Sequence, residues 1–335
     1  MSSPLVAYMK SPVIPKVTVI VPNYNHEMYL QQRLDSILTQ TFPDFEIILL
    51  DDASKDASVA ILSRYQANVK VQRLIVNETN SGSPFKQWNK GLQFARGEYV
   101  WIAESDDYAD PKFLEQLVAR MEANKDVGIA YCQSFKVDAA SNVFGSTADW
   151  TASLGAERWS TDYVCSGEEE CTKYMTFRCI IPNVSCALFR RQALENAGGA
   201  DDSMRYCGDY STYVRVLGVS SILYVAQSLN YFRFSTASVR TKMSGAWLHD
   251  YERAEVLNSI FSGFDVPIET REQAVRAFLE SILRTALSSR QAFATYAAGY
   301  FRLRRSIVRF RSRPEWSLLS VAASILWRRV GRALT

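Results

Sequence analysis

Short apolar runs alternate with amphipathic helical patterns over residues 17–121, and this alternation limits the possible folds more than any other feature of the chain. The apolar runs are rich in β-branched and aromatic residues and have the length of buried strands. The segments between them carry apolar residues three and four positions apart, which is the spacing of one helix face. Alternating strands and helices with short connections predict an α/β fold with a mainly parallel central sheet flanked by helices. The expected strands are residues 17–21, 45–50, 69–76 and 99–103.

Three of these strands lead directly into polar residues. The first is followed by Pro22-Asn23-Tyr24-Asn25, the second ends at Asp51-Asp52, and the fourth leads into Glu104-Ser105-Asp106-Asp107. In a parallel sheet the carboxyl ends of the strands lie at one edge, where open α/β sheets bind ligands. We therefore expect the three clusters to converge on one crevice. Each acidic cluster taken alone is equally consistent with a solvated turn.

The residue types in this crevice suit a nucleotide. Carboxylates are ligands that Mg²⁺ and Mn²⁺ prefer, and Mg²⁺ is often held by one or two of them together with substrate phosphates. The side chains of Tyr24 and the neighbouring asparagines can stack on a base and hydrogen-bond to it. We expect a nucleotide held through its base, its ribose and a metal-bridged pyrophosphate. The first strand is not followed by Gly-x-Gly-x-x-Gly or by a Walker loop, so a dinucleotide fingerprint or P-loop is not supported.

Composition argues against several other classes of protein. The chain has 335 residues, 47% of them hydrophobic and 22% charged, which is ordinary for a globular protein. With two histidines, His26 and His249, histidine-based metal sites and Ser-His-Asp catalysis are disfavoured. The six cysteines form no Cys-x-x-Cys pair, so we expect reduced thiols rather than a disulfide framework or a zinc site.

The formal charge of +3 is unevenly distributed, because arginines are concentrated after Phe301. The apolar segment from Trp316 to Trp327 lies between arginine groups and is too short to span a bilayer. Two interpretations stay open: the segment lies in an anionic membrane surface, or it packs on the domain as an ordinary helix. Since the N-terminus lacks a signal segment, we expect a cytoplasmic protein, with peripheral contact at the inner face of the cytoplasmic membrane under the first interpretation.

The pattern becomes less regular after Asn124. Residues 138–167 form a polar stretch that predicts a long loop acting as a lid or binding loop. Further strands are expected at 128–135, 185–189, 221–225 and 229–234, and the chain is helical in pattern from about residue 246.

Four motifs occurring in order resemble the family 2 glycosyltransferases. They are Val-Ile-Val-Pro-Asn-Tyr-Asn (19–25), Ile-Leu-Leu-Asp-Asp-Ala-Ser-Lys-Asp (48–56), Asn80-x-Gly82, and Ala-Arg-Gly-Glu-Tyr-Val-Trp-Ile-Ala-Glu-Ser-Asp-Asp (95–107). The resemblance covers roughly Lys16 to Arg240. It implies the GT-A (Rossmann-like) fold, a nucleotide-sugar donor, a divalent metal (Mn²⁺ or Mg²⁺) and sugar transfer with inversion.

The resemblance also implies a division of the chain. Residues 1–240 would form the GT-A glycosyltransferase domain, with a nucleotide-sugar-binding half at 16–125 and an acceptor and catalytic-base half at 126–240. Residues 241–335 would form a helical C-terminal extension that ends in the basic tail.

Site residues follow from the same motifs. Pro22, Tyr24 and Asp52 would contact the nucleoside, with Tyr24 against the base. Asp107 would ligate the metal, and Asp106 would contact the ribose or the metal. Glu104 stands where many relatives carry the first acid of an Asp-x-Asp motif, which leaves its role open. The full expected set of nucleotide-sugar contacts is Pro22, Asn23, Tyr24, Asn25, Asp51, Asp52, Asn80, Gly82, Lys86, Asn89, Asp106, Asn183, Ser185 and Arg233.

The remaining roles are assigned from weaker matches. Asn183 and Ser185 match a segment that lines the sugar pocket in relatives, and Arg233 and Arg240 lie where a basic residue often meets the donor phosphates. For Lys86 and Asn89, a solvated helix face is an equally good interpretation.

The catalytic base is expected in the second half of the chain. Inverting transfer needs a carboxylate that takes the proton of the attacking hydroxyl. Cys207-Gly208-Asp209-Tyr210 resembles the family's Glu/Gly-Asp-aromatic motif, whose aspartate is that base, so Asp209 is assigned the role. A helix N-cap is the alternative for Asp209. Asp201 and Asp202 are nearby competitors that we interpret as turn residues.

We therefore expect an inverting, metal-dependent glycosyltransferase that extends a glycan or lipid-linked acceptor in cell-surface polysaccharide biosynthesis, with no nucleic-acid partner. Two alternatives are kept. One is a catalytically inactive, sugar-nucleotide-binding relative that acts as an assembly partner. The other is a sugar-nucleotide pyrophosphorylase, which would require a Gly-rich basic loop where Pro22-Asn23-Tyr24-Asn25 stands.

Overall fold

The structure is a computed structural model that describes residues 14–234, residues 246–288 and isolated positions between 292 and 306. Arg240 and the segment 316–327 lie outside the described residues. Within them, no helix is long and apolar enough to cross a membrane.

The expected α/β fold is confirmed. A ten-stranded sheet has the order β3-β2-β1-β4-β9-β6-β10-β5, with β7 added to β6 and β8 added to β10. The first four strands in this order are parallel neighbours. Strand β9 is antiparallel to both β4 and β6, whereas β6 and β10 run parallel to each other. The strands are β1 (Val17–Asn23), β2 (Phe45–Asp51), β3 (Val71–Val76), β4 (Tyr99–Ile102), β5 (Tyr108–Ala109), β6 (Val127–Val137), β7 (Val143–Ser146), β8 (Tyr163–Ser166), β9 (Ala187–Arg190) and β10 (Ser221–Arg233).

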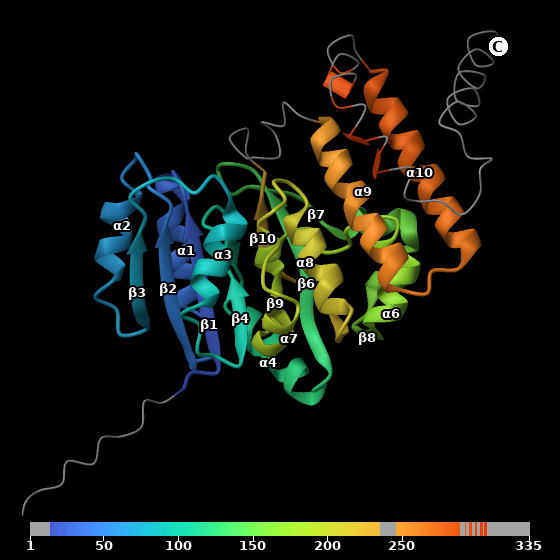
Figure 1. Cartoon of the computed structure of the whole chain (residues 1–335). Coiled ribbons are helices and arrows are strands. Elements are labelled where there is room, and N and C mark those ends of the chain that lie inside the picture. The colour runs from blue at the N-terminus through green and yellow to red at the C-terminus, as the bar shows by residue number, and fades with distance from the viewer. Residues whose placement is uncertain are drawn as a thin grey trace, which may run out of the picture.

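Helices cover the sheet, and α9 and α10 lie side by side beyond one end of it (Figure 1). Strands β1, β2 and β4 are buried along their whole length, as expected for a central parallel sheet covered on both faces. The helices are α1 (Glu27–Leu38), α2 (Ser58–Tyr65), α3 (Pro84–Leu92), α4 (Phe113–Ala123), α5 (Ala148–Thr151), α6 (Gly167–Glu170), α7 (Arg191–Asn196), α8 (Gly208–Leu217), α9 (Ala246–Gly263) and α10 (Ile268–Ala286).

The prediction of a long loop at 138–167 was wrong. This stretch contains β7, α5, two 3₁₀ turns and all of β8, which pairs with β10. Its tryptophans fix it in place: Trp159 is buried and donates a hydrogen bond from Nε1 to the Tyr131 hydroxyl over 2.9 Å, and Trp150 donates one to the Cys179 carbonyl over 2.8 Å. These elements are short and depend on long-range partners, so local periodicity did not reveal them.

The two strands expected at 221–225 and 229–234 form one strand, β10. Its pairing with β6 shifts register between Val225 and Ser228 and again between Ser228 and Asn230. Such bulges bend a strand without ending it.

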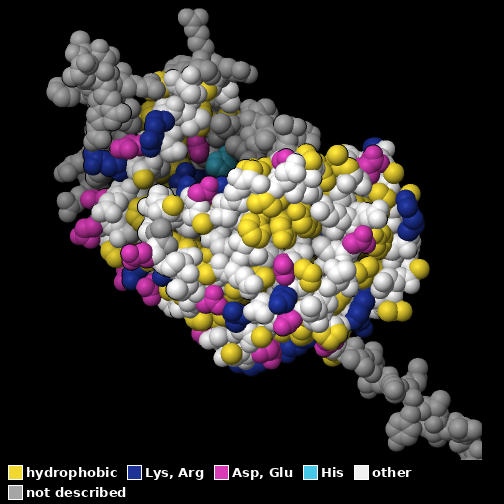
Figure 2. Space-filling model, turned by 180° about the vertical axis from the view of Figure 1, so that it is seen from behind, with side chains coloured by type: hydrophobic (Ala, Val, Ile, Leu, Met, Phe, Trp, Pro, Cys, Tyr) yellow, Lys and Arg dark blue, Asp and Glu magenta, His cyan; other side chains and the backbone are white. Residues whose placement is uncertain are grey.

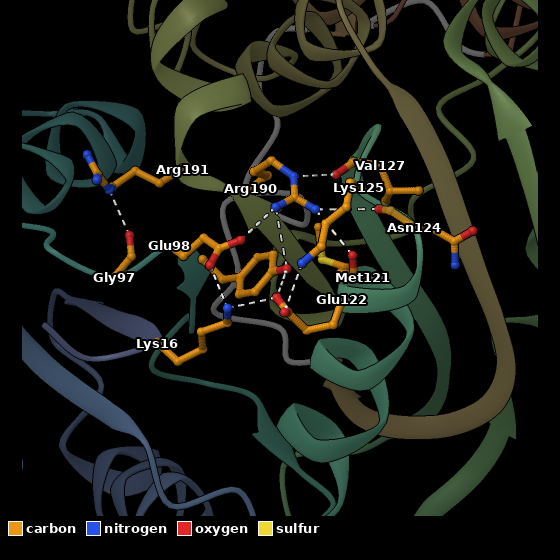
Figure 3. Close-up of polar contacts among 11 residues, drawn as sticks. Lys16, Gly97, Glu98, Met121, Glu122, Asn124, Lys125, Val127, Arg190 and Arg191 are labelled. Atoms are coloured by element: carbon orange, nitrogen blue, oxygen red, sulfur yellow. Dashed lines mark hydrogen bonds and ion pairs between the residues drawn. The ribbon is translucent and has the colours of Figure 1, made fainter.

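An ion-pair network closes the sheet at the ends opposite the polar clusters (Figure 3). Lys16, directly before β1, bonds Glu98 and Glu122, and Arg190 at the end of the antiparallel β9 bonds Glu98 over 2.9 Å. The same guanidinium donates to the main-chain oxygens of Val127 and Met121. This network stabilises the fold at a distance from the expected site.

The rear face of the molecule shows hydrophobic side chains gathered near its centre, with acidic and basic side chains interspersed around them (Figure 2). Interspersed charges of both signs are typical of a solvated protein surface.

Candidate functional site

The first two polar clusters meet at the carboxyl ends of β1 and β2. Asn23 and Asp51 are register partners, and Asn23 Nδ2 donates to Asp51 Oδ2 over 2.8 Å. Asp51 is fully buried and also accepts hydrogen bonds from the amide and hydroxyl of Ser54, at 2.8 and 2.7 Å. The Ser54 hydroxyl in turn accepts from the Asn25 amide, where the backbone turns with a positive φ of 54°. Asp51 therefore holds the loop 23–25 in shape.

Asp52 organises a different loop. Its buried carboxylate accepts hydrogen bonds from the amide and hydroxyl of Ser81 and from the side chains of Asn77 and Gln87, all within 3.0 Å. Asn80 lies in the same turn, where it donates to the Asp52 carbonyl. With so many internal donors, Asp52 fixes the turn that leads into α3.

Tyr24, Gly82 and Lys86 lie on the accessible side of these two loops. The side chain of Tyr24 is 44% exposed, and Gly82 adopts a φ of 75° with open space around its Cα. Lys86 is exposed on the first turn of α3, and its Nζ contacts the Ser81 carbonyl at 3.3 Å. These residues are accessible to a bound nucleotide.

The third cluster follows β4, the parallel neighbour of β1, so it lies at the same sheet edge. Glu104 is largely buried, and its Oε1 accepts a hydrogen bond from Trp88 Nε1 over 2.7 Å. Burial, together with the charge of Asp106, raises the pKa of Glu104 to about 8. Burial and the same neighbour raise the pKa of Asp107 to about 7. These carboxylates repel one another when they are ionised, so a positive charge bound beside them would be stabilised.

The two aspartates of this cluster differ in their free coordination sites. Asp107 is buried, with Oδ1 accepting from the Arg233 amide at 2.8 Å and Oδ2 accepting from Asn183 Nδ2 at 2.6 Å. Asp106 is partly exposed, and no other described residue donates a hydrogen bond to its carboxylate. Burial raises the pKa of Asp106, whereas the charges of Arg33 and Arg233 lower it. Asp106 thus has the more accessible carboxylate, and the assignment of Asp106 and Asp107 as metal ligands stays a prediction.

Arg233 is held by contacts within the protein. Its guanidinium is buried, with Nε donating to the Asp106 carbonyl, Nη1 to the Asp138 carbonyl and Nη2 to Gln32 Oε1, each at 2.7 Å. All three guanidinium nitrogens thus have protein partners, and the expected contact of Arg233 with the donor phosphates stays a prediction.

Three further expected contacts also bond within the protein. Asn183 holds Asp107, and the Ser185 hydroxyl accepts from the Glu104 amide at 3.1 Å. The Asn89 side-chain amide bonds both the N–H and the C=O of Ala200, at 2.7 and 2.9 Å. These internal bonds give the three side chains structural roles, and their expected contacts with the donor stay predictions.

Sequence reasoning missed Arg33 of α1. It is fully buried, its Nε donates to the Glu104 carbonyl at 2.8 Å, and its guanidinium lies 5.3 Å from the centre of the Trp101 ring. Burial lowers the pKa of Arg33 to about 10, against the raising effect of Asp107, Asp106 and Glu104. It is therefore still protonated at neutral pH. The available signal was its spacing, since it lies three residues after Leu30 on the inward face of the helix.

Asp209 lies on the first turn of α8 and is partly exposed. Its Oδ1 accepts a hydrogen bond from the Tyr210 amide at 2.7 Å. Burial raises the pKa of the Tyr213 phenol well above its ordinary value, and the charges of Asp209 and Glu104 both contribute to this shift. The residue before Asp209 packs against α3, since a Cβ atom added at Gly208 would lie 2.6 Å from the ring of Phe85.

The two competitors of Asp209 have other surroundings. Asp201 accepts hydrogen bonds from the hydroxyls of Ser203 and Ser211, at 2.6 and 2.7 Å, and Asp202 is exposed in the turn. Both behave as turn residues.

A metal at this site would need ligands beyond the side chains that the structure describes. No group of three or more His, Cys, Asp or Glu side chains in the described parts of the chain could hold a metal ion. A carboxylate such as Asp106 together with substrate phosphates is the pattern in which Mg²⁺ is commonly bound. The residues present fit a metal that arrives with a phosphorylated ligand.

The sequence is similar to those of known proteins. The sequence model of glycosyl transferase family 2 matches residues 18–198. The poly(ribitol-phosphate) β-N-acetylglucosaminyltransferase TarS of Staphylococcus aureus is 42% identical over 108 residues, which are 31% of this chain and 18% of TarS. The poly(ribitol-phosphate) β-glucosyltransferase of Bacillus spizizenii is 39% identical over 95 residues, 28% of this chain and 15% of that protein. The chain thus spans less than a fifth of these relatives.

Solved structures share the fold. TarS residues 1–349 in complex with UDP-GlcNAc align with a TM-score of 0.56 and 19% identity, over 88% of this chain and 91% of that one. The mannosyltransferase PcManGT of Pyrobaculum calidifontis, in complex with GDP-Man and Mn²⁺, aligns with a TM-score of 0.52 and 19% identity, over 90% and 87% of the two chains.

Proposed function

The chain belongs to glycosyl transferase family 2, and from that premise we propose that it transfers a sugar from a nucleoside-diphosphate sugar to a glycan or lipid-linked acceptor. The observation that carries the proposal is the meeting of Asn23, Asp51, Asp52 and Asp106 at one sheet edge, with accessible Tyr24 beside them. The names of the relatives that act on poly(ribitol phosphate) support an acceptor used in cell-surface polysaccharide biosynthesis.

The donor would be held by the loops at the ends of β1, β2 and β4. Tyr24, with an exposed ring, would stack on the base, and the neighbouring Pro22 and Asn25 would line the same loop. Asp52, Asn80 and Gly82 would shape the nucleoside side of the crevice. Lys86, exposed on α3, would approach the phosphates.

Asp106 would hold a divalent metal, Mn²⁺ or Mg²⁺, together with the donor pyrophosphate. When bound, the metal would neutralise the negative charge that develops on the departing nucleoside diphosphate. The carboxylate of Asp107 bonds Arg233 and Asn183, and these bonds would keep the neighbouring Asp106 in place. The oxygens of Asp107 retain lone pairs, so Asp107 would make a second, weaker contact with the metal. A neighbour solved with GDP-Man and Mn²⁺ supports metal use.

Asp209 would act as the general base. Its carboxylate takes the proton of the acceptor hydroxyl while that oxygen forms a bond to the anomeric carbon and the bond to the diphosphate oxygen breaks. Attack from the face opposite the leaving diphosphate inverts the anomeric centre. The partial exposure of Asp209 at the start of α8 leaves the carboxylate accessible to an acceptor.

Two further assignments remain proposals. Residues 1–240 would form the glycosyltransferase domain and residues 241–335 a C-terminal extension. The arginine-flanked segment 316–327 would bring the protein to the inner face of the cytoplasmic membrane, where a lipid-linked acceptor is available.

An assay of donor turnover tests the proposed function. The purified chain is incubated with UDP-GlcNAc, UDP-glucose or GDP-mannose, Mn²⁺ and poly(ribitol phosphate), and release of nucleoside diphosphate is measured. We expect acceptor-stimulated release with at least one donor and a product of inverted anomeric configuration by NMR. Binding of nucleoside diphosphates without any release would instead favour an inactive, sugar-nucleotide-binding relative.

A further inference from the structure

A single carboxylate organises the backbone just before α8. Glu252, on α9, accepts hydrogen bonds from three consecutive main-chain amides. The Arg205 amide donates to Oε1 at 2.9 Å, and the amides of Tyr206 and Cys207 donate to Oε2 at 2.7 and 2.9 Å. Cys207 is the N-cap of α8, so the carboxylate fixes the path by which the chain enters that helix.

The Glu252 carboxylate is buried and needs these hydrogen bonds. Its side chain is 5% exposed, and a buried carboxylate is tolerated only when it is hydrogen-bonded or paired. The Cys207 amide also depends on it, because this contact is buried and buried N–H groups without a partner are rare in native structures. Each side of this contact therefore stabilises the other.

Further contacts hold α9 against the same region. Cys207 Sγ lies 3.7 Å from the His249 carbonyl, and Arg253 Nη2 donates to the Phe177 carbonyl at 2.9 Å. Helix α9 is thus attached through three residues of adjoining turns, His249, Glu252 and Arg253, of which Glu252 contributes the buried carboxylate.

The opposite side of the same backbone is closely packed. A Cβ atom added at Gly208 would lie 2.4 Å from the Asp201 carbonyl oxygen and 2.6 Å from the ring of Phe85 on α3. The backbone at Gly208 therefore packs closely against α3 and the Asp201 carbonyl, directly after the segment that Glu252 holds. Because Asp209 is the next residue, the fixed backbone at Gly208 also fixes the position of Asp209.

We propose that Glu252 is the positioning residue for Asp209, so that α9 belongs to the catalytic unit although it lies outside the family match at residues 18–198. The inference rests on the proposed function, in which Asp209 is the base. Glu252 acts only through the backbone of residues 205–207 and does not touch the substrate.

Glu252→Gln is the test variant, because it keeps the size of the side chain and leaves one acceptor oxygen in place of two. Glu255→Gln is the matched control, since it makes the same charge change one turn later on α9, where the carboxylate accepts from the Ser306 hydroxyl. Each variant is measured as the full chain, with the donor whose nucleoside diphosphate raises its melting temperature.

For Glu252→Gln we expect kcat to fall at least tenfold, while donor KM and nucleoside-diphosphate affinity stay within twofold of wild type. Amide hydrogen exchange at residues 205–207 should become at least tenfold faster. Glu255→Gln should match wild type in all of these. Wild-type kcat in Glu252→Gln, or equal losses in kcat and nucleotide affinity together with a lowered melting temperature, would overturn the positioning role.

A double variant separates this inference from its premise. In the Asp209→Asn background, Glu252→Gln should cause no further loss of kcat, because both changes disable the same base. A further tenfold loss would show that Glu252 does not act through Asp209. Wild-type turnover in Asp209→Asn alone would refute the base assignment itself, and with it the inference.

Discussion

Arg33 Nε donates a hydrogen bond to the main-chain oxygen of Glu104 over 2.8 Å, while its Nη1 and Nη2 find no partner among the described residues. A buried guanidinium that keeps its charge beside Glu104, Asp106 and Asp107 compensates their repulsion. The protein thus carries an internal cation behind the acidic cluster.

Arg33→Met should therefore destabilise the protein by leaving three crowded carboxylates without this charge. We expect a loss of about 3–5 kcal/mol, the range for removing one partner of a buried charge cluster, measured by urea unfolding. The loss should be smaller at about pH 5.5, where Glu104 and Asp107 are protonated, than at about pH 8. An equal loss at both pH values would show that Arg33 acts by packing alone.

The raised pKa of Glu104 predicts the sign of a pH effect. Between its ordinary value of 4.5 and its folded value of about 8, the folded state holds a proton that the unfolded chain releases. Stability contributed by this proton is therefore lost as the pH rises through this window. The melting temperature of metal-free protein should fall from about pH 5.5 to about pH 8.5.

Glu104→Gln tests which group causes that fall. The amide oxygen can still accept from Trp88 Nε1, but the residue no longer titrates. We expect a flatter dependence of melting temperature on pH in this variant. A slope equal to that of wild type would assign the effect to another group.

Asp106→Asn and Asp107→Asn should fail in different ways. Asp106→Asn should leave the melting temperature nearly unchanged and weaken Mn²⁺-dependent nucleotide binding at least tenfold. Asp107→Asn would place an NH₂ group against the amide of Arg233 or that of Asn183, at a cost of about 1–3 kcal/mol in stability. The reverse pattern, measured by thermal unfolding and titration calorimetry, would make Asp107 the principal metal ligand.

Asp209→Asn should retain nucleotide binding and lose turnover. Removal of a general base costs roughly a hundredfold to ten-thousandfold in rate. The measurement is kcat with saturating donor and acceptor, beside calorimetric affinity for the nucleoside diphosphate. Turnover within threefold of wild type would exclude Asp209 as the base.

Arg190→Met should lower stability without affecting the site. Its guanidinium bonds Glu98 and two main-chain oxygens at the opposite ends of the strands, so the expected loss is about 1–3 kcal/mol with unchanged nucleotide affinity. Lys125→Met is the control, since its pair with Glu122 is exposed and contributes about 0–1 kcal/mol. Equal losses in the two variants would contradict the importance of the partly buried Arg190 contacts.

The central sheet could be predicted because its strands are fully buried. Strands β1, β2 and β4 read as continuous apolar runs in the sequence, and the alternation with helices gave their parallel order. The stretch 138–167 could not be predicted in this way. Strand β8 exists because β10 pairs with it, and Trp159 is buried because Tyr131 accepts its hydrogen bond.

The convergence of the polar clusters was predictable for the same reason, but the direction of individual side chains was not. Arg233 ends a strand next to the site, yet its guanidinium lies inside the protein, where carbonyl oxygens and Gln32 bind it. Arg33 was missed because a helical arginine usually faces solvent. The direction of a charged side chain at the border of a site depends on its tertiary contacts. A single sequence does not identify those contacts.

The central claim is that the sheet edge binds a nucleoside diphosphate together with a metal. The most direct measurement is the melting temperature of wild type and Asp106→Asn with UDP, dTDP, GDP or CMP, each with and without Mn²⁺. Since a ligand that binds only the folded state raises the melting temperature, we predict stabilisation of wild type by one nucleoside diphosphate, dependent on Mn²⁺ and lost in Asp106→Asn. No stabilisation by any nucleotide, or the same stabilisation in Asp106→Asn, would contradict the account.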